Sequence, residues 1–308
     1  MNKKISVCIS AFCIVVVGFL FSSCNKDGVY NPGKKISKIT TNKVVTYDYD
    51  EESNSSSVIQ DYVWEKNQLK QIIHKSIESD GNVWTWTEDF SYDKTDRLIR
   101  VEDKENGEYT TYEYDGDNLS KVCQYSDGFK SVEYNLTYKE SKLSEIECME
   151  FDSYYYATER ENKMNPLELA CSPEIAEMVA ADIALKEETQ PRQKLDVEIY
   201  TISFEWDGDN IEKCIWTYPS YNERYEYLLS YDDKINPFAG FFGLYFDNSY
   251  DDYYIYKNKN NIIKMTQIGS TWQSEYTYTY TGKYPETYKY TNTYSWGKTY
   301  YTCKIEYK

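Results

Sequence analysis

Much of the chain alternates between apolar or aromatic residues and polar residues with a period of two. In the stretch VWTWTEDFSY at 83–92, Trp84 and Trp86 share one phase, and at 276–280 tyrosines alternate with threonines. Such alternation in segments rich in Tyr, Trp and Thr predicts β-strands. Short polar turns such as DGDN at 115–118 follow these runs, and Asp-Gly is a strong hairpin signal because Gly accepts a positive φ. The pattern therefore predicts a chain built from β-hairpins.

The hairpins recur at a nearly constant period. When the chain is aligned on the aromatic residue before each turn, successive steps are 28, 22, 24, 68, 25, 25 and 24 residues. The aligned residues are Trp64, Tyr92, Tyr114, Tyr138, Trp206, Tyr231, Tyr256 and Tyr280. Self-similarity at such a period indicates an array of one supersecondary unit. The single long step indicates an insertion.

After each turn, an aliphatic residue is followed three positions later by a second apolar residue. A step of three breaks strand alternation, so we expect the first residue to pack back under the turn and the second to begin the strand. The pairs are Ile36/Ile39, Leu69/Ile72, Leu98/Val101, Leu119/Val122, Leu143/Ile146, Ile211/Cys214 and Ile262/Met265.

The repeat array starts and stops in the middle of a unit. ISKIT at 36–40 is a downstream half without an upstream partner, and TYYTCKIEYK at 299–308 is an upstream half without a turn after it. We expect these two segments to pair, because closure removes exposed sheet edges. The predicted fold of 35–308 is a single all-β domain, an antiparallel up-and-down meander of about sixteen strands that forms a strongly curved sheet or a barrel.

Two segments interrupt the regular pattern. In the first, a helical insertion at about 164–193, Ser172 can cap a helix and Pro173 suits its first position. Apolar residues then recur at helical spacing, which predicts an amphipathic helix over about 173–188. The second interruption is DDKINPFAGFFGLYF at 232–246. Both contain apolar residues that need cover, and we expect them at one end or on the concave side of the sheet.

The N-terminus carries a secretion signal. Two lysines precede an uncharged run that is too short to span a bilayer and ends in small residues, so residues 1–23 are predicted to be a signal peptide. The sequence FSSC that follows resembles the lipobox of bacterial lipoproteins, which implies cleavage before Cys24 and acylation of this residue. Acyl chains would hold the protein at a membrane. Residues 25–34 contain Gly and Pro without periodicity and are predicted to be a flexible tether. The alternative is an ordinary secreted protein.

The net charge limits the classes of partner. The chain has 34 basic and 51 acidic residues, a formal charge of −17, and the signal peptide contains two of the basic ones. Nucleic acid is therefore not expected as a partner, because affinity for it comes largely from basic residues that neutralise phosphates. The same acidity disfavours direct docking of the whole protein on anionic lipid.

Candidate chemistry is sparse. His74 is the single histidine and no nucleophile motif accompanies it. We therefore expect a structural or surface histidine, and no enzyme, cofactor or metal. The DGDN turns lack the Gly and Glu positions of a calcium-binding EF-hand loop. Five cysteines remain beyond the signal peptide and Cys24, and we expect buried free thiols, with one disulfide as the alternative. They are Cys123, Cys148, Cys171, Cys214 and Cys303.

The aromatic residues are the remaining candidate for a binding site. There are 35 Tyr, 7 Trp and 11 Phe. A row of exposed aromatic rings suits glycan ligands, but for most of these residues we expect cross-strand packing on the sheet's own packed face. If any are exposed for binding, the C-terminal stretch is the candidate, because Lys, Thr, Asn and Ser separate its rings. These residues are Tyr288, Tyr290, Tyr294, Trp296 and Tyr300.

Two family resemblances bear on function. FSYDKTDRLIRVED at 90–103 and YEYDGDNLSKV at 112–122 resemble the YD repeats of Rhs-type wall proteins. Together with the lipobox, YDDKINPF and TGKYPETYKY, they resemble more closely a family of Bacteroidetes lipoproteins with a porin-like fold, and this resemblance supplies no catalytic residues. It implies an outer-membrane lipoprotein at the cell surface or on the periplasmic face, a non-catalytic module that binds glycan or another envelope protein, or plays a structural role. The alternative is a membrane-spanning porin-like barrel.

Overall fold

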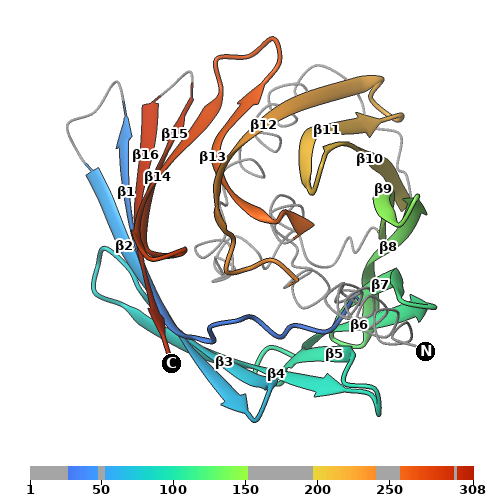
Figure 1. Cartoon of the computed structure of the whole chain (residues 1–308), viewed down its shortest axis with the longest axis horizontal. Coiled ribbons are helices and arrows are strands. Elements are labelled where there is room, and N and C mark those ends of the chain that lie inside the picture. The colour runs from blue at the N-terminus through green and yellow to red at the C-terminus, as the bar shows by residue number, and fades with distance from the viewer. Residues whose placement is uncertain (1–26, 48–52, 152–196, 241–256, 295–296) are drawn as a thin grey trace, which may run out of the picture.

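The structure is a computed structural model, and it describes residues 27–47, 53–151, 197–240, 257–294 and 297–308. Sixteen antiparallel strands make up nearly all of these ranges (Figure 1). The predicted helix at 173–188 and its insertion, together with Cys24, Cys171, Tyr256 and Trp296, lie outside the described residues. Within these ranges, no helix is long and apolar enough to cross a bilayer.

The strands follow one another around the molecule in chain order. The first eight are β1 Ile36–Tyr47, β2 Ser53–Glu65, β3 Gln68–Ile77, β4 Val83–Tyr92, β5 Leu98–Asp103, β6 Glu108–Asp115, β7 Asn118–Ser126 and β8 Phe129–Lys139. The second eight are β9 Lys142–Phe151, β10 Val197–Asp207, β11 Asn210–Tyr218, β12 Glu223–Ile235, β13 Asn260–Gln267, β14 Gln273–Thr281, β15 Tyr284–Thr293 and β16 Gly297–Tyr307.

The sheet closes into a barrel through its first and last strands. β1 pairs with β16 in an antiparallel register that runs from Ile36 opposite Tyr307 to Tyr47 opposite Gly297. The predicted all-β up-and-down meander and its closure are therefore confirmed, and no sheet edge is left for another chain to pair with.

A β-bulge in each unit explains the aliphatic step of three. Opposite Glu113 and Tyr114 of β6, strand β7 places Lys121 and Leu119, so Ser120 is an extra residue. The register shifts in the same way between β2 and β3, β4 and β5, β8 and β9, β10 and β11, and β12 and β13. The bulge returns both apolar residues to the same face. Our expectation that the strand begins only at the second apolar residue was wrong, since β7 already contains Leu119 as well as Val122, and both are completely buried.

In several units, the aromatic residue before the turn donates a hydrogen bond to a backbone carbonyl of the previous unit. The Tyr114 hydroxyl donates to the Leu98 carbonyl at 2.6 Å, Tyr92 donates to Leu69 at 2.7 Å, and the Trp64 indole N–H donates to Ile36 at 2.8 Å. Burial raises the pKa of Tyr92 and Tyr114, which keeps these phenols protonated as donors. These units are thus held to their neighbours by a side-chain hydrogen bond in addition to the strand pairing.

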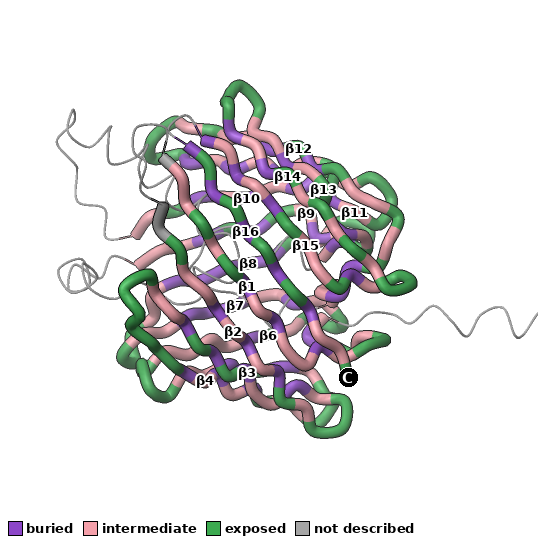
Figure 2. Tube along the Cα trace, turned by 90° about the vertical axis from the view of Figure 1, so that its left-hand side faces the viewer, coloured by how far each residue is buried: buried purple, intermediate pink, exposed green. Residues whose placement is uncertain are grey.

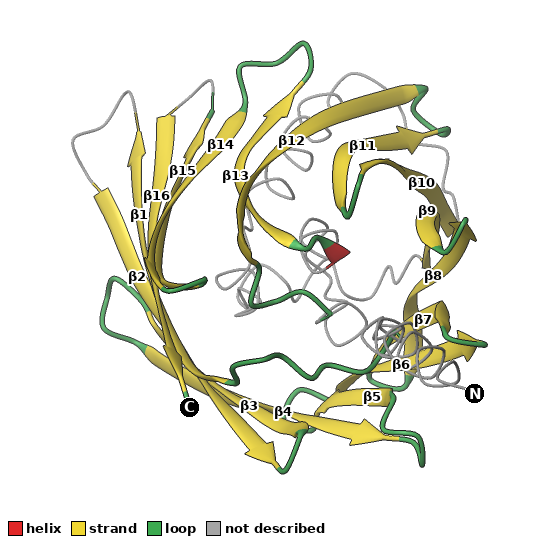
Figure 3. Cartoon of the chain, viewed as in Figure 1, coloured by secondary structure: helices red, strands yellow, loops and turns green. Residues whose placement is uncertain are grey.

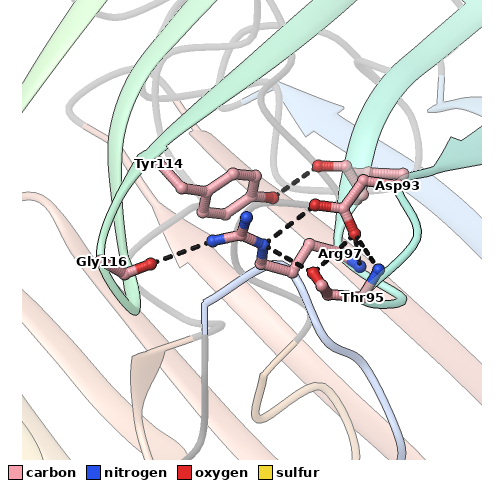
Figure 4. A network of polar contacts seen from close by, with 6 residues as sticks. Asp93, Thr95, Arg97, Tyr114 and Gly116 are labelled. Atoms are coloured by element: carbon pink, nitrogen blue, oxygen red, sulfur yellow. Dashed lines mark hydrogen bonds and ion pairs between the residues drawn. The ribbon is translucent and has the colours of Figure 1, made fainter.

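Polar side chains in the turns also form contacts between neighbouring units, at the same end of the barrel. Figure 4 shows the β4–β5 turn, where Arg97 donates to Asp93 at 3.1 Å and to the Gly116 carbonyl of the β6–β7 turn at 2.9 Å. The guanidinium also lies 4.7 Å from the centre of the Tyr114 ring. The Asp and Gly residues that the sequence marks as turn formers therefore also connect neighbouring turns.

Apolar side chains fill the barrel and polar side chains cover it. Buried and exposed residues alternate along the strands (Figure 2). On β16 the buried phase is Tyr301, Cys303 and Ile305, and the exposed phase is Lys298, Tyr300, Thr302 and Lys304. Cys123, Cys148, Cys214 and Cys303 are buried and free, which confirms the prediction of free thiols for the described cysteines. The hydrophobic effect therefore stabilises this barrel from its interior.

Candidate functional site

Residues 27–35, here called the strap, run across one end of the barrel. In Figure 3 the strap is a loop that crosses the ring of strands from the β6 side to the β1 side. It starts with a backbone hydrogen bond from Asp27 to Asp117 in the β6–β7 turn. It ends beside β16, where the Lys308 amide donates to the Lys35 carbonyl at 3.0 Å. We call this end, with its turns, the strapped rim, and the opposite end the distal rim.

A buried ion pair holds the start of the strap. The Asp27 carboxylate lies 2.5 Å from the Lys257 ammonium, and these side chains are 12% and 16% exposed. The carboxylate also accepts hydrogen bonds from the Tyr138 hydroxyl at 2.6 Å and from the Leu119 amide at 3.0 Å. Burial lowers the pKa of Lys257, and the adjacent Asp27 opposes this shift. Three parts of the chain that are far apart in sequence therefore meet at one carboxylate.

Tyr30 and Gly28 fix the middle of the strap. Tyr30 is buried in the main hydrophobic core, packs 5.6 Å from the Trp64 ring and donates to the Pro237 carbonyl at 2.8 Å. Gly28 has a φ of +79°, and a Cβ at this position would overlap the Tyr114 hydroxyl. The flexible tether predicted for 25–34 was therefore wrong for 27–34, because this part is packed on the barrel. The sequence signal that we missed is a tyrosine in a segment otherwise typical of a linker.

The second interruption also covers the strapped rim. Its described part is 232–240, of which 232–235 continue β12 and 236–240 follow it, and Phe238 packs against the main hydrophobic core. The Asn236 side chain bonds to the Asn258 carbonyl at 3.0 Å. The prediction that this apolar segment lies at one end of the barrel is confirmed for these residues.

The predicted row of exposed aromatic residues does not form a shared surface. Tyr290 and Tyr294 are buried, and Tyr290 stacks inside the barrel on Tyr301, with ring centres 4.2 Å apart. Tyr288 is half-buried and lies 5.6 Å from Tyr278. Only Tyr300 among the described members of this set is exposed, on the outer wall. The expected exposure was wrong for Tyr290 and Tyr294. The phase of β15 that holds Tyr290 faces the interior, where cross-strand packing covers it, and Tyr294, just after β15, is buried in the main hydrophobic core.

His74 lies in a polar cluster inside the barrel. Its Nε2 is 3.1 Å from the Glu88 carboxylate, its ring stacks on Trp86 at 4.5 Å, and its side chain is completely buried. Gln60 lies 3.5 Å from the other ring nitrogen. The histidine thus has neighbours that satisfy and orient it, and such a buried hydrogen-bonded pair is typical of a structural role.

The most exposed large apolar residues lie at the distal rim. Trp84 at the start of β4 is 61% exposed and Phe129 at the start of β8 is 73% exposed. Val83 and Ile268 are also exposed at this end. We did not single out this set from the sequence, because its residues come from three different turns and strand ends along the chain. They lie at one end because the connections β3–β4, β7–β8 and β13–β14 are all at the same end of the barrel.

Comparison with known proteins supports the fold and does not assign a family. No protein-family model matches the chain, and no curated protein matches it. The structure is similar to that of a porin-like protein from Bacteroides uniformis ATCC 8492, with a TM-score of 0.53 and 12% identity, over 91% of this chain and 100% of that chain. A porin-like protein from Bacteroides vulgatus ATCC 8482 gives a TM-score of 0.25 and 10% identity, over 89% of this chain and 99% of that chain. The first similarity extends to the barrel fold alone, and the second is too low to carry an argument.

Proposed function

We propose that this chain is a lipid-anchored, non-catalytic protein of a bacterial cell envelope, placed in the outer membrane at the surface or on the periplasmic face. The observation that carries the proposal is the distance along the chain between the lipobox cysteine and the first contact with the barrel. Cys24 is followed by only two residues before Asp27, whose carboxylate is bound to Lys257. An anchor at Cys24 would therefore hold the folded barrel directly at the membrane surface.

The barrel is proposed to stand beside the membrane and not to span it. A spanning barrel needs an outward apolar band, and a lysine on the lipid face near the bilayer midplane costs about 2–4 kcal/mol. Here the outward positions of β14 include Glu275, Thr277 and Thr279, and those of β16 include Lys298 and Lys304. The main hydrophobic core is on the inside, and isolated apolar residues such as Ile99 and Leu228 are exposed. This distribution favours a barrel surrounded by water.

Membrane fractionation tests both parts of the proposal. In a bacterial host that processes lipoproteins, the native chain is expected in the membrane fraction with an acyl adduct on Cys24, and the Cys24→Ala variant is expected in the soluble fraction. If Cys24→Ala stays in the pellet after carbonate extraction, the barrel spans the membrane. If the native chain carries no adduct, it is not a lipoprotein.

A second candidate function is glycan binding at the distal rim. It is favoured by the exposure of Trp84 and Phe129, since exposed rings stack on the apolar faces of sugars. A polysaccharide at a hundred times its dissociation constant stabilises the folded state by about 2.7 kcal/mol. This corresponds to a rise in melting temperature of roughly 5–10 °C for a domain of this size.

Matched variants locate the proposed glycan site. We expect Trp84→Ala to abolish the thermal shift and Tyr300→Ala, on the outer wall, to retain it. Loss of the shift in Tyr300→Ala alone would move the site to the wall near the predicted C-terminal residues. No shift with any polysaccharide would favour a protein partner or a structural role.

A further inference from the structure

The two rims differ in charge. The strap and the described turns of the strapped rim contain nine basic and six acidic residues. The basic residues are Lys34, Lys35, Lys66, Lys94, Arg97, Lys257, Lys259, Lys283 and Lys308. The described turns of the distal rim contain one basic residue, Lys104, and four acidic ones, Glu78, Asp80, Glu105 and Asp127. Among the described residues of the strap and these turns, basic residues therefore outnumber acidic ones at the strapped rim, and the reverse holds at the distal rim.

The strap limits how far the barrel can move from an anchor at Cys24. Three residue steps separate Cys24 from Asp27, and an extended chain covers at most about 3.6 Å per residue, so the reach is roughly 11 Å. Asp27 itself is held at the strapped rim by Lys257, Tyr138 and Leu119. A strand of ten residues tilted in a barrel adds roughly 25 Å of height. The part of the strapped rim around Asp27 therefore stays within roughly 11 Å of the anchor, whereas the distal rim approaches the same membrane only when the barrel lies on its side.

From the short reach and the basic rim together, we infer that the strapped rim is a membrane-facing surface that lies against anionic phospholipid headgroups. The barrel then stands upright, and the distal rim, with Trp84 and Phe129, points away from the bilayer. This inference rests on the proposed acylation of Cys24. Basic residues near an anionic surface each add a favourable interaction that decays within about 10 Å. Although the chain as a whole is acidic, it therefore docks through the strapped rim, where the described basic residues outnumber the acidic ones.

Energy transfer to labelled lipid measures the orientation. The exposed Ser141 in the β8–β9 turn and the exposed Ser79 in the β3–β4 turn offer matched Ser→Cys substitutions on the two rims. Each acylated variant is labelled with a donor dye and reconstituted into vesicles that contain anionic phospholipid and an acceptor lipid. The acylated parent protein provides the labelling background, since the described native cysteines are buried. We expect transfer from Ser141→Cys to be several-fold more efficient than transfer from Ser79→Cys.

The outcomes separate the two proposals. Equal transfer from both rims, or stronger transfer from Ser79→Cys, in a protein with a verified acyl adduct would overturn the orientation and leave the anchor intact. Absence of the adduct would overturn the anchor and the orientation together. Zwitterionic vesicles test how much of the orientation comes from charge. In these vesicles we expect transfer from Ser141→Cys to remain more efficient than transfer from Ser79→Cys, because the strap is short, but the difference is expected to be smaller.

Release of the strap provides an independent check. Gly28→Ala places a methyl group against the Tyr114 hydroxyl, at a positive φ, and is expected to free the strap and reduce the difference between the rims. Gly208→Ala is the matched control, because its φ is +55° and no atom lies within 4 Å of the added Cβ. A folded Gly28→Ala protein that keeps the full difference would show that the strap does not set the orientation.

Discussion

Replacing Lys257 by Ala is expected to destabilise the folded state by about 3–5 kcal/mol, because the substitution leaves the buried Asp27 carboxylate without its cation. The Tyr138 hydroxyl and the Leu119 amide still donate to this carboxylate, but both are neutral. Since the strap can leave the barrel more easily than the strands can separate, we expect the loss to appear first as detachment of residues 27–35.

Urea unfolding followed by tryptophan fluorescence, together with limited proteolysis near Tyr30, measures the two effects. Lys259→Ala is the matched control two residues away, because Lys259 and Asp209 form an exposed pair, with side chains 67% and 64% exposed, and such pairs contribute about 0–1 kcal/mol. Equal losses in the two variants would contradict a special role for the buried pair. The double variant Asp27→Asn/Lys257→Met is expected to recover much of the stability, since it removes both charges.

Replacing Leu98 by Ala is expected to cost about 2–5 kcal/mol, because it opens a cavity in the layer of aliphatic residues at the strapped rim. Leu98 is completely buried, and its carbonyl accepts the Tyr114 hydroxyl. The equivalent residues of neighbouring units, Leu69 and Leu119, are also completely buried. This layer therefore has little room to collapse around a missing side chain.

The neighbouring residue supplies the control for this prediction. Ile99 is the extra residue of the β4–β5 bulge and is 40% exposed on the outer wall. We expect Ile99→Ala to change the free energy of unfolding by less than about 1 kcal/mol. Unfolding midpoints of the two variants in urea give the comparison. A larger loss for Ile99→Ala would mean that the bulge places its side chains differently from the structure.

The candidate site was less predictable than the wall of the barrel. Tyr290 and Tyr300 lie in the same tyrosine-rich stretch, yet one is buried in the barrel and the other exposed outside it. Tyrosine is compatible with both faces of a strand, so composition could not separate them. The contacts of Asp27 also could not be predicted from the sequence, since Lys257 is 230 residues away along the chain. No local pattern encodes a pair at such a separation.

The sequence by itself determined the hairpin units and the approximate number of strands, and it predicted that the first and last strands pair, because alternation and turn residues are local signals that recur along the chain. The tertiary structure alone decided which side chains face inward at each bulge and how the strap crosses one rim. It also decided how charged residues and exposed aromatic rings are distributed between the two ends of the barrel. These features depend on closing the ring, which brings residues together from turns that are far apart in the chain. Their physical cause is burial and charge pairing across the barrel, and neither has a local signature.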